Sequence, residues 1–257
     1  MDRQHALVVE NVSRSFGGIR AVGGVSFTLD AGESMVLIGP NGAGKTTLFN
    51  LVTGEIPIDT GKIYLFGEDI SKASVQRRSE LGLVRTYQIC NLFSELTVEQ
   101  NLYLSLKNSN WKASRGIKEY FVSWKTNKVR IDRVSQILKE IQLEDKRHVN
   151  VENISHGEQR QLELGMALIT DPKIVLLDEP MAGLSATERV FIGEIIKKIA
   201  KEKIILVIEH NIEFALSITD RVAVMNFGEF VTIGTPDEVQ NSSEVQQIYK
   251  LDSTMED

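Results

Sequence analysis

The sequence lacks three features that would indicate large classes of protein. It has a single cysteine, Cys90, so no internal disulfide can form and the cytosol is the expected compartment. No uninterrupted apolar run approaches the ~18 residues that a membrane-spanning helix needs. Residues 1–12 contain no apolar core of a secretory signal. Any role at a membrane must therefore come through a partner.

An excess of positive charge is also missing. The 257 residues carry a formal net charge of −6, and 42% are hydrophobic and 25% charged, as in ordinary soluble globular proteins. The length is close to the upper limit for one hydrophobic core. The negative charge argues against nucleic-acid binding by a global positive field, and a local basic patch stays open. We expect no nucleic-acid partner.

What the sequence does contain is a glycine-rich octet at residues 39–46, Gly-Pro-Asn-Gly-Ala-Gly-Lys-Thr. It fits the P-loop pattern, in which two glycines separated by four residues are followed by Lys and then Ser or Thr. The apolar run 35–38 precedes it and a helical stretch, 47–51, follows it. This strand–loop–helix context favours a P-loop over a glycine-rich turn that binds nothing.

The residue types in this octet suit a nucleotide phosphate. Gly42 and Gly44 let the backbone turn its N–H groups toward phosphate oxygens, and the following helix N-terminus adds partial positive charge. Lys45 supplies a full charge to the β- and γ-phosphates, and the Thr46 hydroxyl is placed to bind Mg²⁺. The predicted ligands are thus ATP and Mg²⁺. The predicted nucleotide-binding residues of the loop are Asn41, Gly42, Ala43, Gly44, Lys45, Thr46 and Thr47.

The apolar pattern predicts an α/β fold. Strands are expected at 6–12, 25–29, 35–38, 63–66, 81–86, 174–177 and 204–208, with a hairpin of 221–226 and 230–234. Helices are expected at 98–106, 131–141, 157–168 and 187–201. Residues 88–170 form a mostly helical insertion between 1–87 and 171–257, which make the α/β core.

Polar residues follow the predicted interior strands. Asp178 and Glu179 end the run 174–177, His210 follows 204–208, and Gln88 follows 81–86. Ligands of α/β sheets bind at the carboxyl ends of strands, so Asp178 could orient Mg²⁺ and Glu179 could polarise an attacking water. In isolation each has an ordinary structural interpretation: a solvated turn for the carboxylates, a structural histidine for His210, and no meaning for Gln88.

Residues 155–159, Ser-His-Gly-Glu-Gln, open a predicted helix. Ser155, Gly157 and the helix N-terminus together could bind a second anion. The alternative is an ordinary N-cap in which Glu158 completes a capping box, and taken alone this alternative is the better one.

In their order along the chain these motifs resemble the nucleotide-binding domain of ABC (ATP-binding cassette) transporters. The matches are the P-loop at 39–46, the Q-loop at Gln88, the signature at 155–159, the Walker B strand at 174–179, the D-loop at 182–185 and the switch histidine at His210. Phe16 stands at the position of the adenine-stacking aromatic. The resemblance covers nearly the whole chain. It implies a P-loop NTPase core with an N-terminal antiparallel β element and an inserted helical subdomain.

The resemblance also implies how ATP is hydrolysed. In the family two such domains meet head to tail, so Ser155, Gly157 and Glu158 would act on the nucleotide held by the partner's P-loop. Glu179 would orient or deprotonate the attacking water, and His210 and Lys45 would contact the phosphates. Thr46, Gln88 and Asp178 would hold the metal.

A narrower resemblance is to the ATP-binding subunits of branched-chain amino acid importers, with urea and short-chain amide importers closely similar. It rests on residues 85–88, the basic insertion at 107–128, residues 178–180 with 182–184, Glu209 with His210, and the tail at 234–241. It implies a peripheral place at the cytoplasmic face of the inner membrane, permease subunits that dock near residues 88–104, and indirectly a solute-binding protein. A second ATP-binding subunit is implied, with a heterodimer favoured over a homodimer.

Several residues depart from the family pattern. Ile154, His156 and Glu158 differ from the usual signature, and Ser185 replaces the usual D-loop aspartate, which leaves that residue's cross-dimer contact open. An exporter or lipid-extraction ATPase is the nearer alternative function. A non-transport ABC ATPase would carry a long coiled-coil insertion or a second cassette, and the chain has neither. An inactive cassette is disfavoured by the intact Lys45, Asp178 and Glu179.

Overall fold

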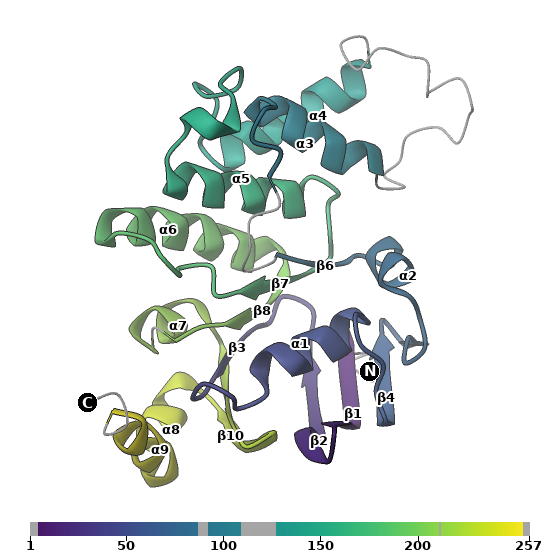
Figure 1. The fold of residues 1–257 in the computed structure, drawn as a ribbon, viewed down its shortest axis with the longest axis vertical. Helices are drawn as coiled ribbons and strands as arrows, with labels where there is room; N and C mark the ends of the chain where they lie inside the picture. The colour runs from purple at the N-terminus through teal and green to yellow at the C-terminus, as the bar shows by residue number, and fades with distance from the viewer. Residues whose placement is uncertain (1–4, 87–91, 109–126, 211, 254–257) are drawn as a thin grey trace. The chain divides into compact units, whose positions relative to one another are not determined.

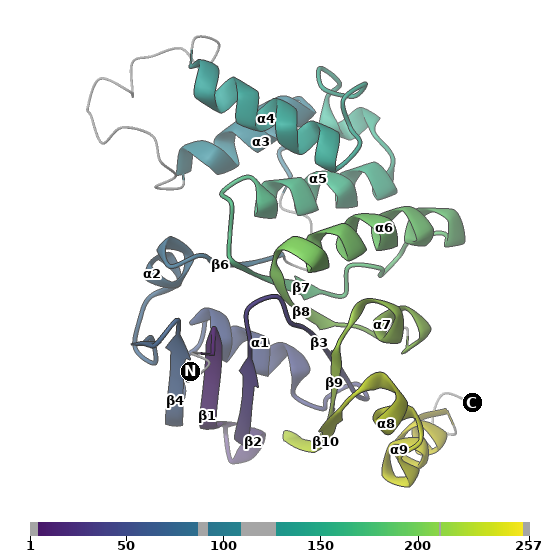
Figure 2. The same ribbon diagram turned by 180° about the vertical axis from the view of Figure 1, so that it is seen from behind.

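The computed structural model describes residues 5–86, 92–108, 127–210 and 212–253 (Figures 1 and 2). The chain divides into two compact units. The first comprises Met1–Arg85, Lys173–Met181 and Ile196–Asp257, and the second comprises Thr86–Pro172 and Ala182–Ile195. Among the helices of the described ranges, none combines the length and the apolar character needed to cross a bilayer.

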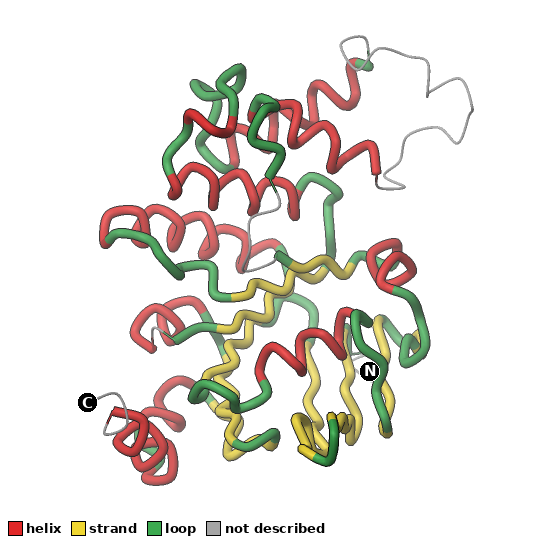
Figure 3. Tube along the Cα trace, viewed as in Figure 1, coloured by secondary structure: helices red, strands yellow, loops and turns green. Residues whose placement is uncertain are grey.

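An antiparallel sheet of four strands opens the first unit, in the order β2-β1-β4-β5. Its longer strands are among the segments drawn in yellow in Figure 3. The strands are β1 (Leu7–Phe16), β2 (Ile19–Leu29), β4 (Thr60–Leu65) and β5 (Glu68–Asp69). This sheet is the predicted N-terminal β element, but its strands have other bounds than predicted: the strand expected at 6–12 spans Leu7–Phe16, and the strand expected at 63–66 begins at Thr60. The strand expected at 25–29 already begins at Ile19. The strand expected at 63–66 ends at Leu65, because Phe66 has a φ of 49° and starts the turn into β5.

The second sheet of this unit has six strands in the order β10-β9-β3-β8-β7-β6. Its members are β3 (Ser34–Ile38), β6 (Leu83–Arg85), β7 (Ile174–Asp178), β8 (Ile204–Ile208), β9 (Arg221–Asn226) and β10 (Glu229–Gly234). All pairs are parallel except the predicted hairpin of β9 and β10, which is antiparallel. Every residue of β3, β7 and β8 is buried, which explains their continuous apolar sequences.

The strand predicted at 81–86 is shorter than expected. Leu81 caps the C-terminus of α2 (Val75–Glu80), and Gly82 has a φ of 99°, so both belong to the turn before β6. Helix α2 itself was missed, although Ser74 caps its N-terminus by accepting a hydrogen bond from the Arg77 amide. The structure also contains α7 (Ile212–Ile218), α8 (Pro236–Gln240) and α9 (Ser243–Ser253), which the sequence analysis did not predict.

Helix α1 (Lys45–Thr53) joins the two sheets through one apolar core. Its buried residues Leu48, Phe49, Leu51 and Val52 pack in the same cluster as apolar side chains from β1, β2, β3, β7 and β8. The helix begins at Lys45, the seventh residue of the glycine-rich octet. The core therefore fixes the helix N-terminus that the octet leads into (Figure 1).

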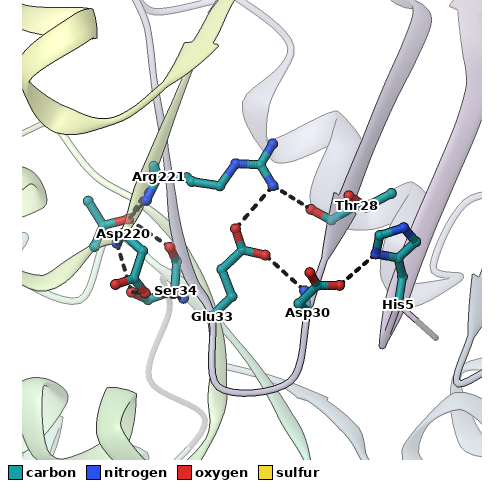
Figure 4. Close-up of polar contacts among 8 residues, drawn as sticks. His5, Thr28, Asp30, Glu33, Ser34, Asp220 and Arg221 are labelled. Atoms are coloured by element: carbon teal, nitrogen blue, oxygen red, sulfur yellow. Dashed lines mark hydrogen bonds and ion pairs between the residues drawn. The ribbon is translucent and has the colours of Figure 1, made fainter. Parts of the chain in front are cut away.

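Figure 4 shows the polar contacts that tie the turn between β2 and β3 to the start of β9. Arg221 donates to Glu33 Oε1 at 3.1 Å and to the carbonyl of Thr28 at 3.0 Å. Asp220 accepts hydrogen bonds from the backbone amide and the hydroxyl of Ser34 at 2.9 and 2.6 Å. Because β3 continues into the glycine-rich octet, these contacts fix the strand that positions it.

The second unit consists of helices and their connections in its described residues, and it includes residues 182–195, which the sequence analysis assigned to the α/β core. It contains α3 (Val98–Asn108), α4 (Lys128–Glu140), a 3₁₀ turn (Val151–Asn153), α5 (His156–Leu168) and residues 186–195 of α6 (Ala186–Glu202). Gly165 lets α5 approach its neighbours closely. A Cβ there would lie 2.6 Å from Ile141 Cδ1 and 3.1 Å from Ile137 Cγ2.

Candidate active site

Residues 39–44 of the glycine-rich octet form a tight loop between β3 and α1, and its last two residues begin the helix. Its Gly39 and Gly44 have φ values of 151° and 100°, which other residues rarely adopt. A Cβ on Gly39 would lie 2.1 Å from the Met225 carbonyl oxygen, and one on Gly44 would lie 2.3 Å from that of Ala21. The backbone of the loop is therefore held against β9 and β2, and no larger residue fits either position.

The Lys45 ammonium lies within this loop. Its Nζ donates to the carbonyls of Gly39 at 2.7 Å and Pro40 at 2.9 Å, and the residue is only 6% exposed. These carbonyls compensate the buried charge. Because they come from the loop itself, the charge is held where the loop's own N–H groups would meet a phosphate.

The other predicted residues of the loop occupy distinct places. Asn41 and Thr46 are exposed, Thr47 is half-buried, and Ala43 is buried, with its carbonyl accepting a hydrogen bond from the Gly228 amide at 2.9 Å. Thr46 is the second residue of α1. Its hydroxyl is thus on the first turn of a helix that directly follows the loop, as the P-loop interpretation requires.

Asp178 and Glu179 lie at the carboxyl end of β7. Asp178 is 3% exposed and accepts a hydrogen bond from Arg85 Nη2 at 2.6 Å. Arg85 ends the neighbouring strand β6, and its side chain is 5% exposed. The structure thus pairs the predicted metal-binding carboxylate with a buried cation that the sequence analysis did not assign to the site.

Glu179 and His210 come together at adjacent strand ends. Glu179 Oε1 lies 3.0 Å from His210 Nε2, and the Glu179 amide donates to the Ile208 carbonyl at 3.0 Å. Glu179 has a φ of 48°, a conformation that costs energy for a residue with a Cβ and is concentrated at functional sites. Two of the predicted catalytic residues are therefore in direct contact.

A buried carboxylate, Glu209, holds the backbone of His210 and the backbone close to Glu179. It is 3% exposed, and its Oε1 accepts a hydrogen bond from the Met181 amide at 3.0 Å. Its Oε2 accepts one from the His210 amide at 3.1 Å. Glu209 therefore holds the backbone two residues after Glu179 and the backbone of His210 with one side chain.

The donor set suits Mg²⁺ bound together with phosphates. Within the described ranges no three His, Cys, Asp or Glu side chains gather as an all-protein metal cage. Magnesium in nucleotide sites uses one or two protein oxygens, the substrate phosphates and waters. The Thr46 hydroxyl and the Asp178 carboxylate fit that requirement. Gln88, the third predicted metal ligand, lies outside the described residues.

In the second unit, Ser155 and Glu158 form the capping box that the sequence analysis gave as the alternative. The Ser155 hydroxyl accepts from the Glu158 amide at 3.2 Å, and Glu158 Oε2 accepts from the Ser155 amide at 2.7 Å. This contact shows a structural role for both residues. It leaves the predicted role toward a partner's nucleotide as a prediction.

Gly157 contacts a residue that the sequence analysis did not consider, Glu188 of α6. Its amide donates to Glu188 Oε1 at 3.0 Å, and a Cβ on Gly157 would lie 2.5 Å from that oxygen. Glu188 Oε2 also accepts from the hydroxyl and the amide of Ser185, at 2.7 and 2.9 Å. The hydrogen bonds from Ser185, with a smaller contribution from the Gly157 amide, hold the pKa of the Glu188 carboxyl below its ordinary value.

A pocket of about 320 Å³ adjoins this contact within the second unit. Ser155, Gly157, Glu158, Glu188 and Phe191 are among its lining residues. The His156 ring lies close to Gly183, where a Cβ would be 3.3 Å from His156 Nε2. Ser185, the residue at the predicted D-loop position, contacts Glu188, and Glu188 in turn contacts Gly157 of the predicted signature segment.

The comparison with protein families decides the identity of this fold and loop. The family model described as ABC transporter matches residues 22–182, which include the glycine-rich octet and both Asp178 and Glu179. The chain belongs to the ABC transporter family. The resemblance predicted from the motifs is confirmed, and the chain is an ATP-binding subunit with the ATPase fold of that family.

Curated relatives of this ABC subunit match it over nearly the whole chain. The branched-chain amino acid transport ATP-binding protein LivG of Salmonella typhimurium is 35% identical over 250 residues, 96% of this chain and 98% of the relative. BraF of Pseudomonas aeruginosa, with the same description, is 33% identical over 248 residues, 95% of this chain and 96% of the relative. The lipopolysaccharide export ATP-binding protein LptB of Escherichia coli is 32% identical over 244 residues, 95% and 96% of the two chains.

A solved ABC cassette has the same fold. The ADP conformation of MJ1267, an ATP-binding cassette of an ABC transporter, superimposes with a TM-score of 0.83 at 29% identity. The match covers 95% of this chain and 98% of that chain. The predicted α/β fold with a P-loop NTPase core is therefore confirmed.

Three residues that contact predicted site residues of this ABC subunit escaped the sequence analysis: Arg85 and Glu209 in the first unit, and Glu188 in the second. Glu188 did leave a signal, because Ser185 and Glu188 have the spacing of a capping box at the start of α6. Arg85 and Glu209 were among the residues that carry the narrower resemblance to importer subunits, but they were given no role in the site. Their contacts with Asp178 and with the Met181 amide depend on how neighbouring strands align in the sheet, which sequence spacing does not give.

Phe16 remains the predicted platform for adenine. It ends β1, is 45% exposed, and has the Arg14 guanidinium 4.9 Å from its ring centroid. Base–aromatic stacking contributes ~1–3 kcal/mol. We expect Phe16→Ala to weaken ATP affinity by roughly 5- to 150-fold, since ~1.4 kcal/mol is a factor of ten. Titration with a fluorescent ATP analogue measures this, and Phe16→Tyr, which keeps the ring, is the control. Unchanged affinity in a folded Phe16→Ala protein would assign the ring to packing alone.

Proposed function

We propose that this ABC subunit hydrolyses Mg²⁺-bound ATP to drive import of branched-chain amino acids or a related small polar solute, such as urea or a short-chain amide. It works at the cytoplasmic face of the inner membrane, on integral-membrane permease subunits. The observation that carries the hydrolytic part is the contact of 3.0 Å between Glu179 and His210 at adjacent strand ends. The names of LivG and BraF support the solute class.

In this proposal each side chain has one task. Lys45 and the loop amides stabilise charge on the transferring phosphoryl group. Glu179 orients or deprotonates the attacking water, and His210 contacts the γ-phosphate. Bound Mg²⁺ would neutralise charge on the β- and γ-phosphates, held by the Thr46 hydroxyl, the Asp178 carboxylate and, as the sequence predicts, Gln88.

The catalytic unit in this proposal is a dimer of ATP-binding subunits, with the whole chain acting as one ATP-binding domain. Ser155, Gly157 and Glu158 would face the ATP held by the partner's P-loop. A heterodimer with a related subunit is favoured over a homodimer by the family resemblance. A solute-binding protein would deliver the solute on the other side of the membrane.

A second candidate function has one specific observation in its favour. LptB, a lipopolysaccharide export subunit, is 32% identical over 95% of this chain, close to the value for BraF. An exporter would use the same residues for ATP hydrolysis. The two functions differ in what stimulates the ATPase and in the direction of transport.

Reconstitution tests the proposal. The subunit is assembled in liposomes with its permease and solute-binding protein, and uptake of radiolabelled leucine, isoleucine, valine and urea is measured with and without ATP. We expect ATP-dependent uptake of at least one of these solutes, absent with Glu179→Gln. ATPase stimulation by lipopolysaccharide, with none by these solutes, would instead support the exporter.

A further inference from the structure

We propose that Arg85 is a positioning residue for the Mg²⁺ that accompanies ATP, acting through Asp178 and not by touching the nucleotide. This inference rests on the proposed function, because it takes Asp178 as a residue that holds the metal. Three observations carry it: the burial of the Arg85–Asp178 pair, the separate partners of the two terminal nitrogens of Arg85, and the helix to which Arg85 is anchored.

The pair is buried and close. Arg85 Nη2 lies 2.6 Å from Asp178 Oδ2, with the two side chains 5% and 3% exposed. Two buried charges are stable only with good geometry and further hydrogen bonds. A carboxylate with one oxygen held in this way keeps a fixed orientation, which a metal site needs and a freely rotating carboxylate does not provide.

The other terminal nitrogen of Arg85 reaches a different part of the molecule. Nη1 donates to Asn50 Oδ1 and, at 3.2 Å, to Glu55 Oε1. The guanidinium also lies 5.6 Å from the centroid of the Phe49 ring, within the ~6 Å range of a cation–π contact. Arg85 is therefore held at both of its terminal nitrogens, and its guanidinium also contacts the Phe49 ring.

The anchoring residues determine what Arg85 positions. Phe49 and Asn50 lie on α1, the helix whose first two residues are Lys45 and Thr46. Arg85 thus connects the Asp178 carboxylate to the helix that carries the Thr46 hydroxyl. These are the two described side chains assigned to the metal in the proposed function. The distance between the Thr46 hydroxyl and the Asp178 carboxylate therefore depends in part on the Arg85 guanidinium, which contacts both α1 and Asp178.

Lysine cannot replace arginine in this arrangement. The guanidinium is a rigid planar fork that donates in two directions at once, whereas an ammonium is a compact point charge on a flexible stem. Arg85→Lys keeps the positive charge that compensates Asp178 and Glu55. It loses the simultaneous contacts with α1 and Asp178, so the substitution separates positioning from charge compensation.

The experiment measures the Mg²⁺ requirement of nucleotide binding in place of turnover. A fluorescent, non-hydrolysable ATP analogue is held at fixed concentration, and Mg²⁺ is titrated against the native protein and Arg85→Lys. Loss of a side chain that orients a metal ligand typically costs roughly 10- to 100-fold in metal affinity. We expect the half-saturating Mg²⁺ concentration to rise by about that factor, and the affinity for the analogue in EDTA to stay within about twofold.

Matched variants separate the outcomes. Arg77→Lys is the control, because Arg77 is half exposed and pairs with Glu68 at 2.9 Å on the surface; it should leave the Mg²⁺ requirement unchanged. Asp178→Asn tests the proposed function itself. If Asp178→Asn leaves the Mg²⁺ requirement unchanged, the metal role of Asp178 is wrong. If Asp178→Asn raises it and a folded Arg85→Lys protein does not, the role of Arg85 is wrong.

A milder variant covers the case in which Arg85→Lys does not fold. Asn50→Ala removes one anchor of the guanidinium at the surface of α1 and leaves the buried Arg85–Asp178 pair in place. We expect a smaller shift of the Mg²⁺ requirement in the same direction. A lower melting temperature of the nucleotide-free protein, with no shift in that requirement, would assign Arg85 a purely structural role.

Discussion

Replacing Glu179 with glutamine is expected to lower ATP hydrolysis by ~10²–10⁴-fold, the usual cost of losing a positioned general base. The structure sharpens this expectation. Glu179 Oε1 lies 3.0 Å from His210 Nε2. The amide oxygen of a glutamine can take the same position and accept the same hydrogen bond. The substitution therefore removes basicity while it preserves the geometry of the pair. ATP binding should survive, and an ATP-bound dimer should accumulate.

Steady-state phosphate release from the reconstituted complex measures the loss, and equilibrium nucleotide binding measures what is retained. Glu194→Gln is the control, because Glu194 is an exposed carboxylate on α6. Near-native hydrolysis in Glu179→Gln would remove Glu179 from its catalytic role. Equal losses of hydrolysis and binding would show that the substitution disturbs the strained backbone at this residue, whose φ is 48°.

The sequence predicted the site best where neighbours along the chain determine the chemistry. The glycine-rich octet, the strand β3 before it and α1 after it are local in sequence, and their spacing encodes both the loop and its charge. The strands β7 and β8 were also found, because strands buried on both faces have continuous apolar sequences. Their carboxyl ends then placed Asp178, Glu179 and His210 at one edge of the sheet.

The rest depended on contacts between residues far apart in the chain. Arg85 and Asp178 meet because β6 and β7 pair with Arg85 opposite Leu176, and no spacing rule gives that register. Glu188 reaches Gly157 across 31 residues, through the packing of α5 near the start of α6. Short helices such as α2 were missed for another reason: six residues are too few to show a helical period.

Ser155→Arg is expected to lower the rate of ATP hydrolysis in the assembled transporter by roughly 100-fold or more. The isolated subunit should still bind ATP through its own P-loop. An arginine at the N-cap of α5 opposes the positive end of the helix dipole and fills the space that a partner's phosphate would enter. The Ser155 hydroxyl is also part of a capping box, so its loss alone has a structural cost.

Ser155→Ala is therefore the matched control. It removes the cap, which costs ~0.5–2 kcal/mol of stability, but it leaves the space open. If the cross-dimer role is correct, Ser155→Ala should retain measurable hydrolysis and Ser155→Arg should not. Similar losses in both variants, accompanied by similar drops in melting temperature, would assign Ser155 to the capping box only.

The hydrogen bond between Gly157 and Glu188 bears on the proposed binding of a partner's phosphate at this helix end. The Gly157 amide that would meet a partner's phosphate donates to Glu188 at 3.0 Å in this structure, and Ser185 holds the same carboxylate. A phosphate at this helix end must compete with that carboxylate for the amide. Glu188→Gln, which keeps the shape but removes the charge, should therefore favour the ATP-bound dimer and not weaken it.

Mixing two inactive variants tests the cross-dimer arrangement directly. If the subunit pairs with a second copy of itself, an equal mixture of Ser155→Arg and Lys45→Ala subunits places both lesions in one composite site of each mixed dimer and none in the other. Random pairing makes about half of the dimers mixed, and each mixed dimer has one intact site of its two equivalent sites. About a quarter of all composite sites are therefore intact. Recovery of ATPase in the mixture, absent from either variant alone, is the expected result. No recovery, in mixtures shown by mass spectrometry to contain mixed dimers, would mean that Ser155 acts on the nucleotide of its own chain or on none.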